Sequence, residues 1–178
     1  YKNKNILVTG NTGFKGSWLS LWLKKLGANL FGISDKIPTE PSMFDILDLE
    51  SQINQVYGDI RDTKLLNNYV NEVKPDFIFH LAAQPLVSVS YYDPINTISA
   101  NVMGTANVLD SLKESDFKCT CVLITSDKCY NNIEQIWGYK EIDELGGKDI
   151  YSGSKGAAEL IFKSYYHTFY HKSDNIRL

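Results

Sequence analysis

The sequence has no apolar run long enough to cross a membrane and no cluster of basic residues. A spanning helix needs roughly 18 or more apolar residues, and the first ten residues lack the basic and apolar regions of a secretion signal. Eighteen Lys and Arg against 21 Asp and Glu leave a net charge of −3, so the electrostatic footprint of a nucleic-acid binder is missing. We expect a cytoplasmic protein with a small or polar partner, bound to no membrane and no nucleic acid.

Cysteine is also scarce. Cys119, Cys121 and Cys129 are odd in number and lack CxxC spacing, which argues against disulfide pairing or a redox or zinc site. Cys119 and Cys121 alternate within an apolar run, so we expect buried thiols on one strand face in a reducing compartment. His167 and His171 are one helical turn apart, but no third ligand is evident, and we expect no metal site.

What is present is enough for one packed domain. The chain has 178 residues, 43% of them hydrophobic, and no repeat, linker or low-complexity segment divides it. We interpret residues 1–178 as one domain. Residues 175–178 read as the opening of a further strand, and we expect the natural polypeptide to continue.

Short apolar runs alternate with helical patterns along the chain. Buried parallel strands are expected at 5–9, 29–34, 53–57, 76–81 and 119–125. Helices are expected at 14–26, 43–49, 63–73, 94–114 and 152–171. The alternation predicts βαβ units with right-handed crossovers. The expected fold class is α/β, a doubly wound, Rossmann-type parallel sheet.

A glycine-rich turn joins the first strand to the first helix with GxxGxxG spacing. Glycine allows positive φ and lets the backbone approach a pyrophosphate, while the helix N-terminus offers N–H groups. Glycines used only for a tight turn would look similar, but the flanking strand and helix favour a dinucleotide site. The candidate loop residues are Gly10, Asn11, Thr12, Gly13, Phe14, Lys15 and Gly16.

Residues at the ends of later strands extend this candidate site. Asp35 ends the second strand, where a carboxylate can accept hydrogen bonds from a ribose and repel a 2′-phosphate, which favours NAD over NADP. Asp35 could instead be a solvated loop carboxylate, and the adjacent Lys36 could accept a phosphate. Ligands of such sheets bind outside the carboxyl ends of the strands. By this rule we add Asp59 and Ile60 for the adenine, and Leu81, Ala82, Ala83 and Gln84 for the middle of the cofactor.

Tyr151 and Lys155 lie one helical turn apart on one helix face. A tyrosine acts as a base near neutral pH only if its phenolate is stabilised, and a neighbouring Lys and the positive nicotinamide ring both lower a pKa that starts near ~10. Tyr151 would then take the proton of a substrate hydroxyl as hydride leaves to NAD. After a GxxGxxG loop, this spacing predicts an active site.

Ser126, Asp127 and Lys128 follow the fifth strand at the same sheet edge. Ser126 could hydrogen-bond the substrate hydroxyl and orient it toward Tyr151. A simple dehydrogenase or epimerase needs little else, so the adjacent acid and base suggest a further proton-transfer step. A surface salt bridge within a loop would give the same pair.

These motifs resemble the extended short-chain dehydrogenase/reductases and, within them, the CDP-glucose 4,6-dehydratases. Asp127-Lys128 is the most discriminating element, because the dTDP-glucose and GDP-mannose enzymes usually carry an acidic pair there. Two departures are Asn11 in place of a His and Ile150 in place of a Pro. The matching stretches are 8–19, 80–87, 101–105, 125–130, 137–139, 145–147 and 151–156.

The resemblance implies an internal redox cycle on CDP-glucose or a related nucleotide sugar. Tyr151, Ser126 and Lys155 would support oxidation of the 4-hydroxyl, which makes the C5 proton acidic. Lys128, kept neutral by burial beside the nicotinamide and Lys155, would remove that proton. Asp127 would protonate the departing 6-hydroxyl before the hydride returns to carbon 6. The product would be CDP-4-keto-6-deoxyglucose, a precursor of dideoxy sugars of bacterial surface polysaccharide.

The resemblance also implies parts beyond this chemistry. A smaller C-terminal lobe would hold most of the nucleotide, and the helices at 94–114 and 152–171 would pair with their counterparts in a homodimer. Two alternatives stay open: a nucleotide-sugar 4-epimerase or other extended member of the family, and a non-catalytic NAD-binding regulator. Five aromatic residues are expected to be core or helix-packing residues: Trp18, Trp22, Tyr165, Tyr166 and Tyr170.

Overall fold

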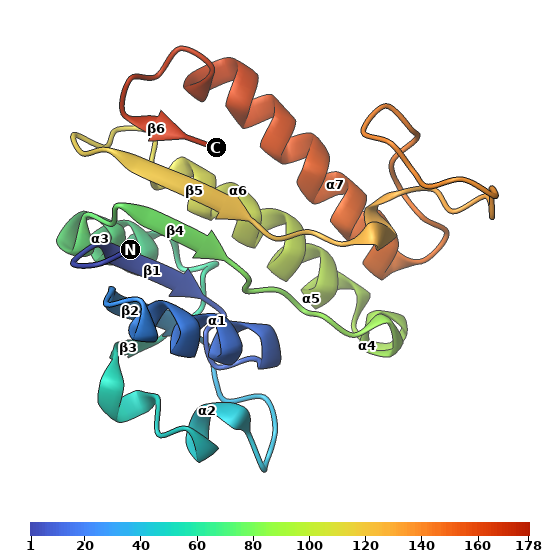
Figure 1. Ribbon diagram of the computed structural model, residues 1–178. Helices are drawn as coiled ribbons and strands as arrows, with labels where there is room; N and C mark the ends of the chain where they lie inside the picture. The colour runs from blue at the N-terminus through green and yellow to red at the C-terminus, as the bar shows by residue number, and fades with distance from the viewer.

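The computed structural model describes all 178 residues and contains a six-stranded sheet in the order β3-β2-β1-β4-β5-β6 (Figure 1). All strand pairs are parallel. The order runs in opposite directions from β1, so the doubly wound fold predicted from the alternation is confirmed. The strands are β1 (Asn5–Thr9), β2 (Asn29–Ser34), β3 (Asn54–Tyr57), β4 (Phe77–His80), β5 (Cys119–Leu123) and β6 (Ile176–Arg177).

The helices agree with the sequence in position but differ in extent. The predicted helix 94–114 consists of α5, a π-helical segment and α6, and its helical part ends at Asp110; α4 was not predicted. No helix combines the length and the low polarity that crossing a membrane requires. The α-helices are α1 (Phe14–Lys25), α2 (Met43–Ile46), α3 (Thr63–Val73), α4 (Val87–Tyr92), α5 (Pro94–Ile98), α6 (Gly104–Asp110) and α7 (Ile150–Tyr165). Two 3₁₀-helical segments, η1 (Glu50–Gln52) and η3 (Asp127–Cys129), and two π-helical segments, η2 (Ser99–Met103) and η4 (Tyr166–Tyr170), complete the set.

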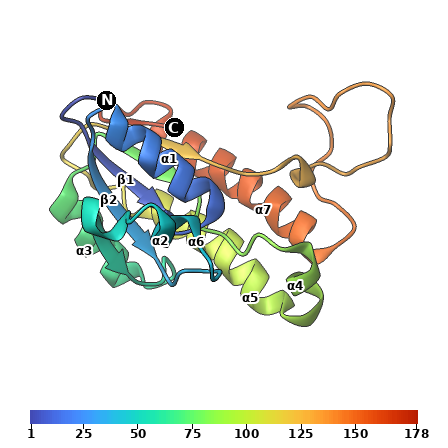
Figure 2. The same ribbon diagram turned by 60° about the horizontal axis from the view of Figure 1, so that its bottom comes forward.

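The two faces of the sheet are covered unequally. Leu7 points into a core of 15 buried residues built with α3, α6 and α7, whereas its neighbours Ile6 and Val8 point into a core of five beneath α1. Figures 1 and 2 show α1 on one side of the strands and α6 and α7 on the other. On the α1 side, Val122 and Ile124 stay 37% exposed. The β4–β5 part of that face is therefore only partly covered.

The buried thiols are confirmed. Cys119 and Cys121 are 3% and 1% exposed and belong to the larger core, and Cys129 is buried as well. Burial raises the pKa of the Cys119 thiol to about 12. Ile176 pairs with Cys119 in the short strand β6, so the strand opening predicted near the end of the chain is also present.

The prediction for the tryptophans was wrong. Trp18 and Trp22 are 54% and 65% exposed, because α1 directs them along its flank rather than onto the sheet. Tyr170 is buried, and its hydroxyl donates to the Leu109 carbonyl oxygen, as a helix-packing residue should. Tyr165 is partly buried against the larger core.

Candidate active site

The glycine loop connects β1 to α1 at the carboxyl edge of the sheet. Gly10 has φ +72°, and a Cβ atom there would lie 2.6 Å from the Ala82 backbone nitrogen. A Cβ atom on Gly16 would collide with the Gly10 carbonyl oxygen. Gly13 is the N-cap of α1 and supplies no capping side chain, and the first turn contains no acid. The N–H groups at this helix end are therefore open to an anion.

In the loop, the side chains of Asn11 and Thr12 are buried, whereas those of Phe14 and Lys15 are exposed. Thr12 is buried, and its Oγ1 donates to the Lys36 carbonyl oxygen at 2.7 Å. Phe14 is 74% exposed and Lys15 is exposed, both in the first turn of α1. Phe14 and Lys15 are therefore open to solvent at the start of α1.

Asn11, one of the predicted loop residues, is anchored through its side chain. Its side chain is fully buried beneath the loop, where Nδ2 donates to Gln55 Oε1 at 2.6 Å and Oδ1 accepts from Ser34 Oγ at 2.8 Å. Gly32 leaves the space that the Asn11 amide fills. The Asn11 side chain thus holds the loop against β2 and β3.

The ends of β2 and β3 bring acidic side chains near a cation that sequence reasoning missed. Asp35 is exposed just after β2, and its charge acts on Arg61 together with that of Asp59. Arg61 Nη2 lies 2.5 Å from Asp59 Oδ2, and this hydrogen bond lowers the pKa of the Asp59 carboxyl. Ile60 is 6% exposed and its side chain lies in the larger core, so only its backbone could contact an adenine.

The segment after β4, which holds the predicted residues Leu81, Ala82, Ala83 and Gln84, passes against Gly10 of the glycine loop. The Ala82 N–H donates to Thr9 Oγ1 at 3.1 Å, which holds the segment against β1. The Gln84 side chain donates to Thr97 Oγ1 at 2.8 Å. The Gln84 side-chain amide is therefore hydrogen-bonded within the fold.

A buried hydrogen-bond chain behind this segment was not predicted. Thr9 Oγ1 lies 2.7 Å from His80 Nδ1, and His80 Nε2 lies 3.2 Å from Thr105 Oγ1. Because the Thr105 hydroxyl donates to the Asn101 carbonyl oxygen, His80 must donate through Nε2 and accept through Nδ1. Burial lowers the pKa of His80 to about 3. His80 is a neutral, fixed link between β1, β4 and the η2–α6 helix.

Asn101 lies in the π-helical segment η2, also outside the predicted site. Its Oδ1 accepts from the Gln84 N–H at 2.8 Å, and its Nδ2 donates to Ser154 Oγ at 2.9 Å. Ser154 sits between Tyr151 and Lys155 on α7. Asn101 therefore joins the loop after β4 to the helix that carries the predicted tyrosine and lysine.

Tyr151 and Lys155 are brought together as predicted. Asp149 caps α7 by accepting from the Ser152 N–H at 3.0 Å, which sets the helix start just before Tyr151. Tyr151 is 8% exposed and Lys155 is 7% exposed. The Lys155 Nζ lies 6.0 Å from the Tyr151 ring centroid. Burial lowers the pKa of the Lys155 ammonium, and the charge of Lys15 lowers it further.

Ser126, Asp127 and Lys128 lie beside the start of α7. Ser126 caps η3: its Oγ accepts from the Lys128 N–H at 3.2 Å and donates to Asp127 Oδ1 at 3.0 Å. Gly156 allows this approach, because a Cβ atom there would lie 3.1 Å from the Cys129 carbonyl oxygen. Asp127 and Lys128 form no salt bridge with each other. Lys128 is exposed, so the burial expected for it is not found within this chain.

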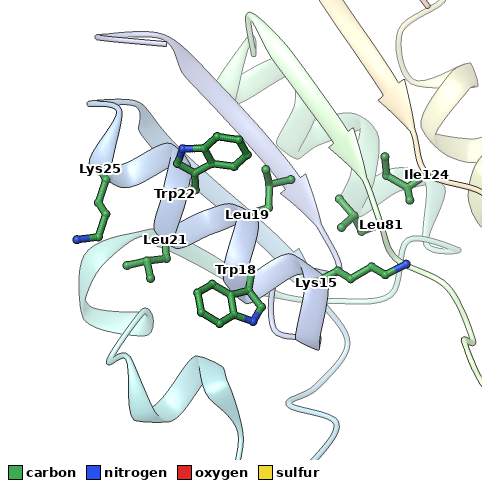
Figure 3. Close-up of a pocket in the computed structure, with 8 residues that line it drawn as sticks. All are labelled: Lys15, Trp18, Leu19, Leu21, Trp22, Lys25, Leu81 and Ile124. Atoms are coloured by element: carbon green, nitrogen blue, oxygen red, sulfur yellow. The ribbon is translucent and has the colours of Figure 1, made fainter.

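An open apolar groove of about 590 Å³ extends along α1 from the glycine loop (Figure 3). Figure 3 shows the Lys15 side chain reaching toward Leu81 and Ile124, with Trp18 and Trp22 farther along the helix. The groove adjoins the sparsely covered face of β4 and β5. The lining residues are Lys15, Trp18, Leu19, Leu21, Trp22, Lys25, Leu81 and Ile124.

No cluster of three His, Cys, Asp or Glu side chains is arranged to hold a metal ion. His167 and His171 have ring centroids 6.4 Å apart and are both exposed. The candidate active site consists of a glycine loop, a buried tyrosine and lysine, and a turn that carries a serine, an aspartate and a lysine.

The fold and this site define a Rossmann domain of the short-chain dehydrogenase/reductase type. The family profile for GDP-mannose 4,6 dehydratase matches residues 7–178. The chain belongs to that family.

Two relatives in which similar sequences occur are 4,6-dehydratases of other nucleotide sugars. It is 48% identical over 174 residues to CDP-glucose 4,6-dehydratase of Salmonella typhimurium, covering 98% of this chain and 48% of that protein. It is 30% identical to dTDP-D-glucose 4,6-dehydratase of Dictyostelium discoideum, covering 93% of this chain and 41% of that protein. The chain thus spans about half the length of the curated relatives it matches.

Solved structures of two proteins resemble this chain in fold. A dTDP-glucose 4,6-dehydratase double mutant from Streptomyces venezuelae, crystallised with NAD, superposes with a TM-score of 0.80 at 25% identity, over 92% of this chain and 52% of that one. UDP-glucose 4-epimerase from Brucella ovis, in complex with NAD, has a TM-score of 0.80 at 23% identity, covering 93% of this chain and 49% of that one. The latter likeness supports the fold alone.

Proposed function

We propose that this chain is the NAD-binding part of a nucleotide-sugar 4,6-dehydratase that converts CDP-glucose to CDP-4-keto-6-deoxyglucose and water. The observation that carries the proposal is the buried pairing of Tyr151 with Lys155 beside the Ser126–Lys128 turn. The 48% identity to a CDP-glucose 4,6-dehydratase supports the choice of sugar nucleotide.

The residues of the loop fit a dinucleotide. A side chain at Gly10 would meet the Leu81–Ala82 backbone, and one at Gly16 would meet the Gly10–Asn11 backbone. The start of α1 offers uncapped N–H groups to a diphosphate. Asp35 would hold the adenosine ribose, Asp59 and the Ile60 backbone would lie by the adenine, and the backbone from Leu81 to Gln84 would line the middle. When bound, NAD would accept a hydride from carbon 4 of the sugar and return it to carbon 6.

The first proton transfer is assigned to Tyr151. Ser126 Oγ would hydrogen-bond the sugar 4-hydroxyl and orient it, while the Tyr151 phenolate would take its proton. The Lys155 ammonium would stabilise that phenolate and hold the cofactor ribose. Ser126 caps η3 and the buried Tyr151 lies on α7, and these two elements pack against each other.

The elimination is assigned to the neighbouring acid and base. Once the 4-hydroxyl is a ketone, the C5–H bond is acidic; neutral Lys128 would take this proton, and Asp127 would give a proton to the departing 6-hydroxyl, which leaves as water. The proton held by Lys128 would return to C5 when carbon 6 is reduced. Substrate would have to cover Lys128 for it to become neutral, since its side chain is exposed here.

We also propose that residues 1–178 form one NAD-binding domain and that a further lobe holds most of the nucleotide. Support comes from coverage of only 48% of the Salmonella relative. The exposed apolar groove along α1 is a surface that such a lobe could adjoin.

We further propose that the protein is a homodimer in the reducing cytoplasm. Apolar side chains without partners line the outer faces of α5, η2 and α7, including Ile95 at 75%, Met103 at 52% and Leu160 at 54% exposure. A shared helical interface would bury them. Leu160→Glu should then convert a dimer to a monomer in light scattering, whereas Ile142→Glu, at a 90% exposed loop position, should not.

The activity is tested by mass spectrometry of products from a panel of nucleotide-glucose donors. The full-length protein with NAD should remove one water from CDP-glucose and accumulate no reduced cofactor. A product of unchanged mass would indicate a 4-epimerase instead. If water is lost only from a donor other than CDP-glucose, the protein is still a dehydratase but the CDP assignment is excluded. If no donor reacts, a non-catalytic regulator is favoured.

A further inference from the structure

Glu159 lies one helical turn beyond Lys155 on α7, on the face that also carries Tyr151. Thr125 Oγ1 donates to Glu159 Oε1 at 2.5 Å in a partly buried setting. Thr125 directly precedes Ser126. This one hydrogen bond therefore ties the chain after β5, which positions Ser126, to the helix that positions Tyr151 and Lys155.

The charges around Lys155 give Glu159 a second effect. Lys155 is 7% exposed and forms no salt bridge. Lys15 from the start of α1 disfavours its ammonium form, and burial does so more strongly; Glu159 is the one group that favours it. His80, which faces it from β4, is neutral, and Tyr151 lies one turn away on α7.

We propose that Glu159 is a positioning residue that holds the turn after β5 against α7 through Thr125 and supplies the counter-charge that keeps Lys155 protonated. The proposal rests on the proposed function, because a protonated Lys155 matters only where Tyr151 works as a phenolate. Glu159 contacts neither substrate nor reacting atoms in this scheme. The two effects belong to different groups, the Thr125 hydroxyl and the Glu159 charge, so they can be separated by mutation.

The charge effect is tested by NMR of lysine labelled with ¹³C at the ε carbon in the full-length protein with NAD. Lys155→Arg identifies the Lys155 resonance. In Glu159→Gln, the midpoint of the Lys155 titration should fall by about one pH unit, because a nearby opposite charge has been removed. Glu141→Gln, in an exposed loop, should leave the midpoint unchanged. An unchanged midpoint in Glu159→Gln would overturn the counter-charge role, and this readout needs no turnover.

The tethering effect is tested by single-turnover hydride transfer from CDP-glucose. Thr125→Val should slow this step about ten-fold or more, because misplacing reacting groups slightly is costly, while Thr125→Ser should restore it. In Glu159→Gln, the alkaline limb of the rate profile should also move to lower pH. Equal rates in Thr125→Val and the wild type would remove the tether. Absence of hydride transfer in the wild type, with the NMR shift intact, would refute the proposed function but not the electrostatic role of Glu159.

Discussion

The ammonium of Lys155 lies 6.0 Å from the centre of the Tyr151 ring, one turn farther along α7, and both side chains are withdrawn from solvent. Burial lowers the pKa of this lysine, so its charge depends on what surrounds it. The fold thus places beside the phenol a lysine whose ammonium form is disfavoured by burial.

Tyr151→Phe should lower the rate of hydride transfer by at least about 100-fold, because the residue that accepts the hydroxyl proton is gone. NAD affinity, measured by calorimetry, should remain within a few-fold of wild type. Tyr92→Phe is a matched control at a 90% exposed position and should change neither quantity. A fully active Tyr151→Phe enzyme would remove the tyrosine from the mechanism.

Lys128→Met should separate oxidation from elimination. The 4-hydroxyl is still oxidised, so single-turnover formation of reduced cofactor should persist, but water loss should fall by at least about 100-fold because the base for the C5 proton is missing. Lys140→Met, in the same exposed loop region, should behave as wild type. Unchanged dehydration by Lys128→Met would transfer the base role to another residue.

Gly16→Ala should impair the loop through backbone contact. A methyl group there would collide with the Gly10 carbonyl oxygen, and overpacking of this kind costs about 1–3 kcal/mol in unfolding free energy. Denaturant titration should show that loss together with weaker NAD binding. Gly138→Ala meets no atom within 4 Å and should show neither. If Gly16→Ala bound NAD normally, close packing between residue 16 and the Gly10 carbonyl group would not be required for NAD binding.

His80 predicts a specific dependence of stability on pH. The folded protein keeps His80 neutral down to about pH 3, whereas a histidine in the unfolded chain binds a proton below its ordinary pKa of 6.5. Its stabilising contribution is therefore complete above pH 6.5 and declines as the pH falls toward 3. Between pH 7 and pH 5, wild type should lose about 2 kcal/mol more than His80→Gln in urea unfolding.

The control for this comparison is His167→Gln, an exposed histidine that should follow the wild-type pH dependence. The comparison uses the difference between two pH values for each variant, so a uniform destabilisation by the mutation does not affect it. Identical losses in wild type and His80→Gln would show that His80 is not held neutral.

The parts of the site that depend on local spacing could be predicted from the sequence. Gly10, Gly13 and Gly16 act through backbone geometry between one strand and one helix, and Tyr151 and Lys155 are neighbours on any α-helix. The doubly wound parallel sheet followed likewise from the alternation of strands and helices.

Side-chain directions could not be predicted, because they depend on partners distant in sequence. The Asn11 amide meets Gln55, 44 residues away, and so points under the loop. Asn101 meets Ser154, 53 residues away, within a helix that widens into a π segment. Trp18 and Trp22 show an apolar helical pattern, but burial requires a second element over that flank of α1. In this chain the flank is an open groove.

The fate of the hydride tests the central claim most directly. The full-length protein is incubated with NAD and CDP-glucose carrying deuterium at carbon 4, and the product is analysed by NMR. The account predicts deuterium at carbon 6 of a 4-keto-6-deoxy sugar, and no such transfer in Tyr151→Phe. Deuterium that remains at carbon 4, or returns there after inversion, would contradict it.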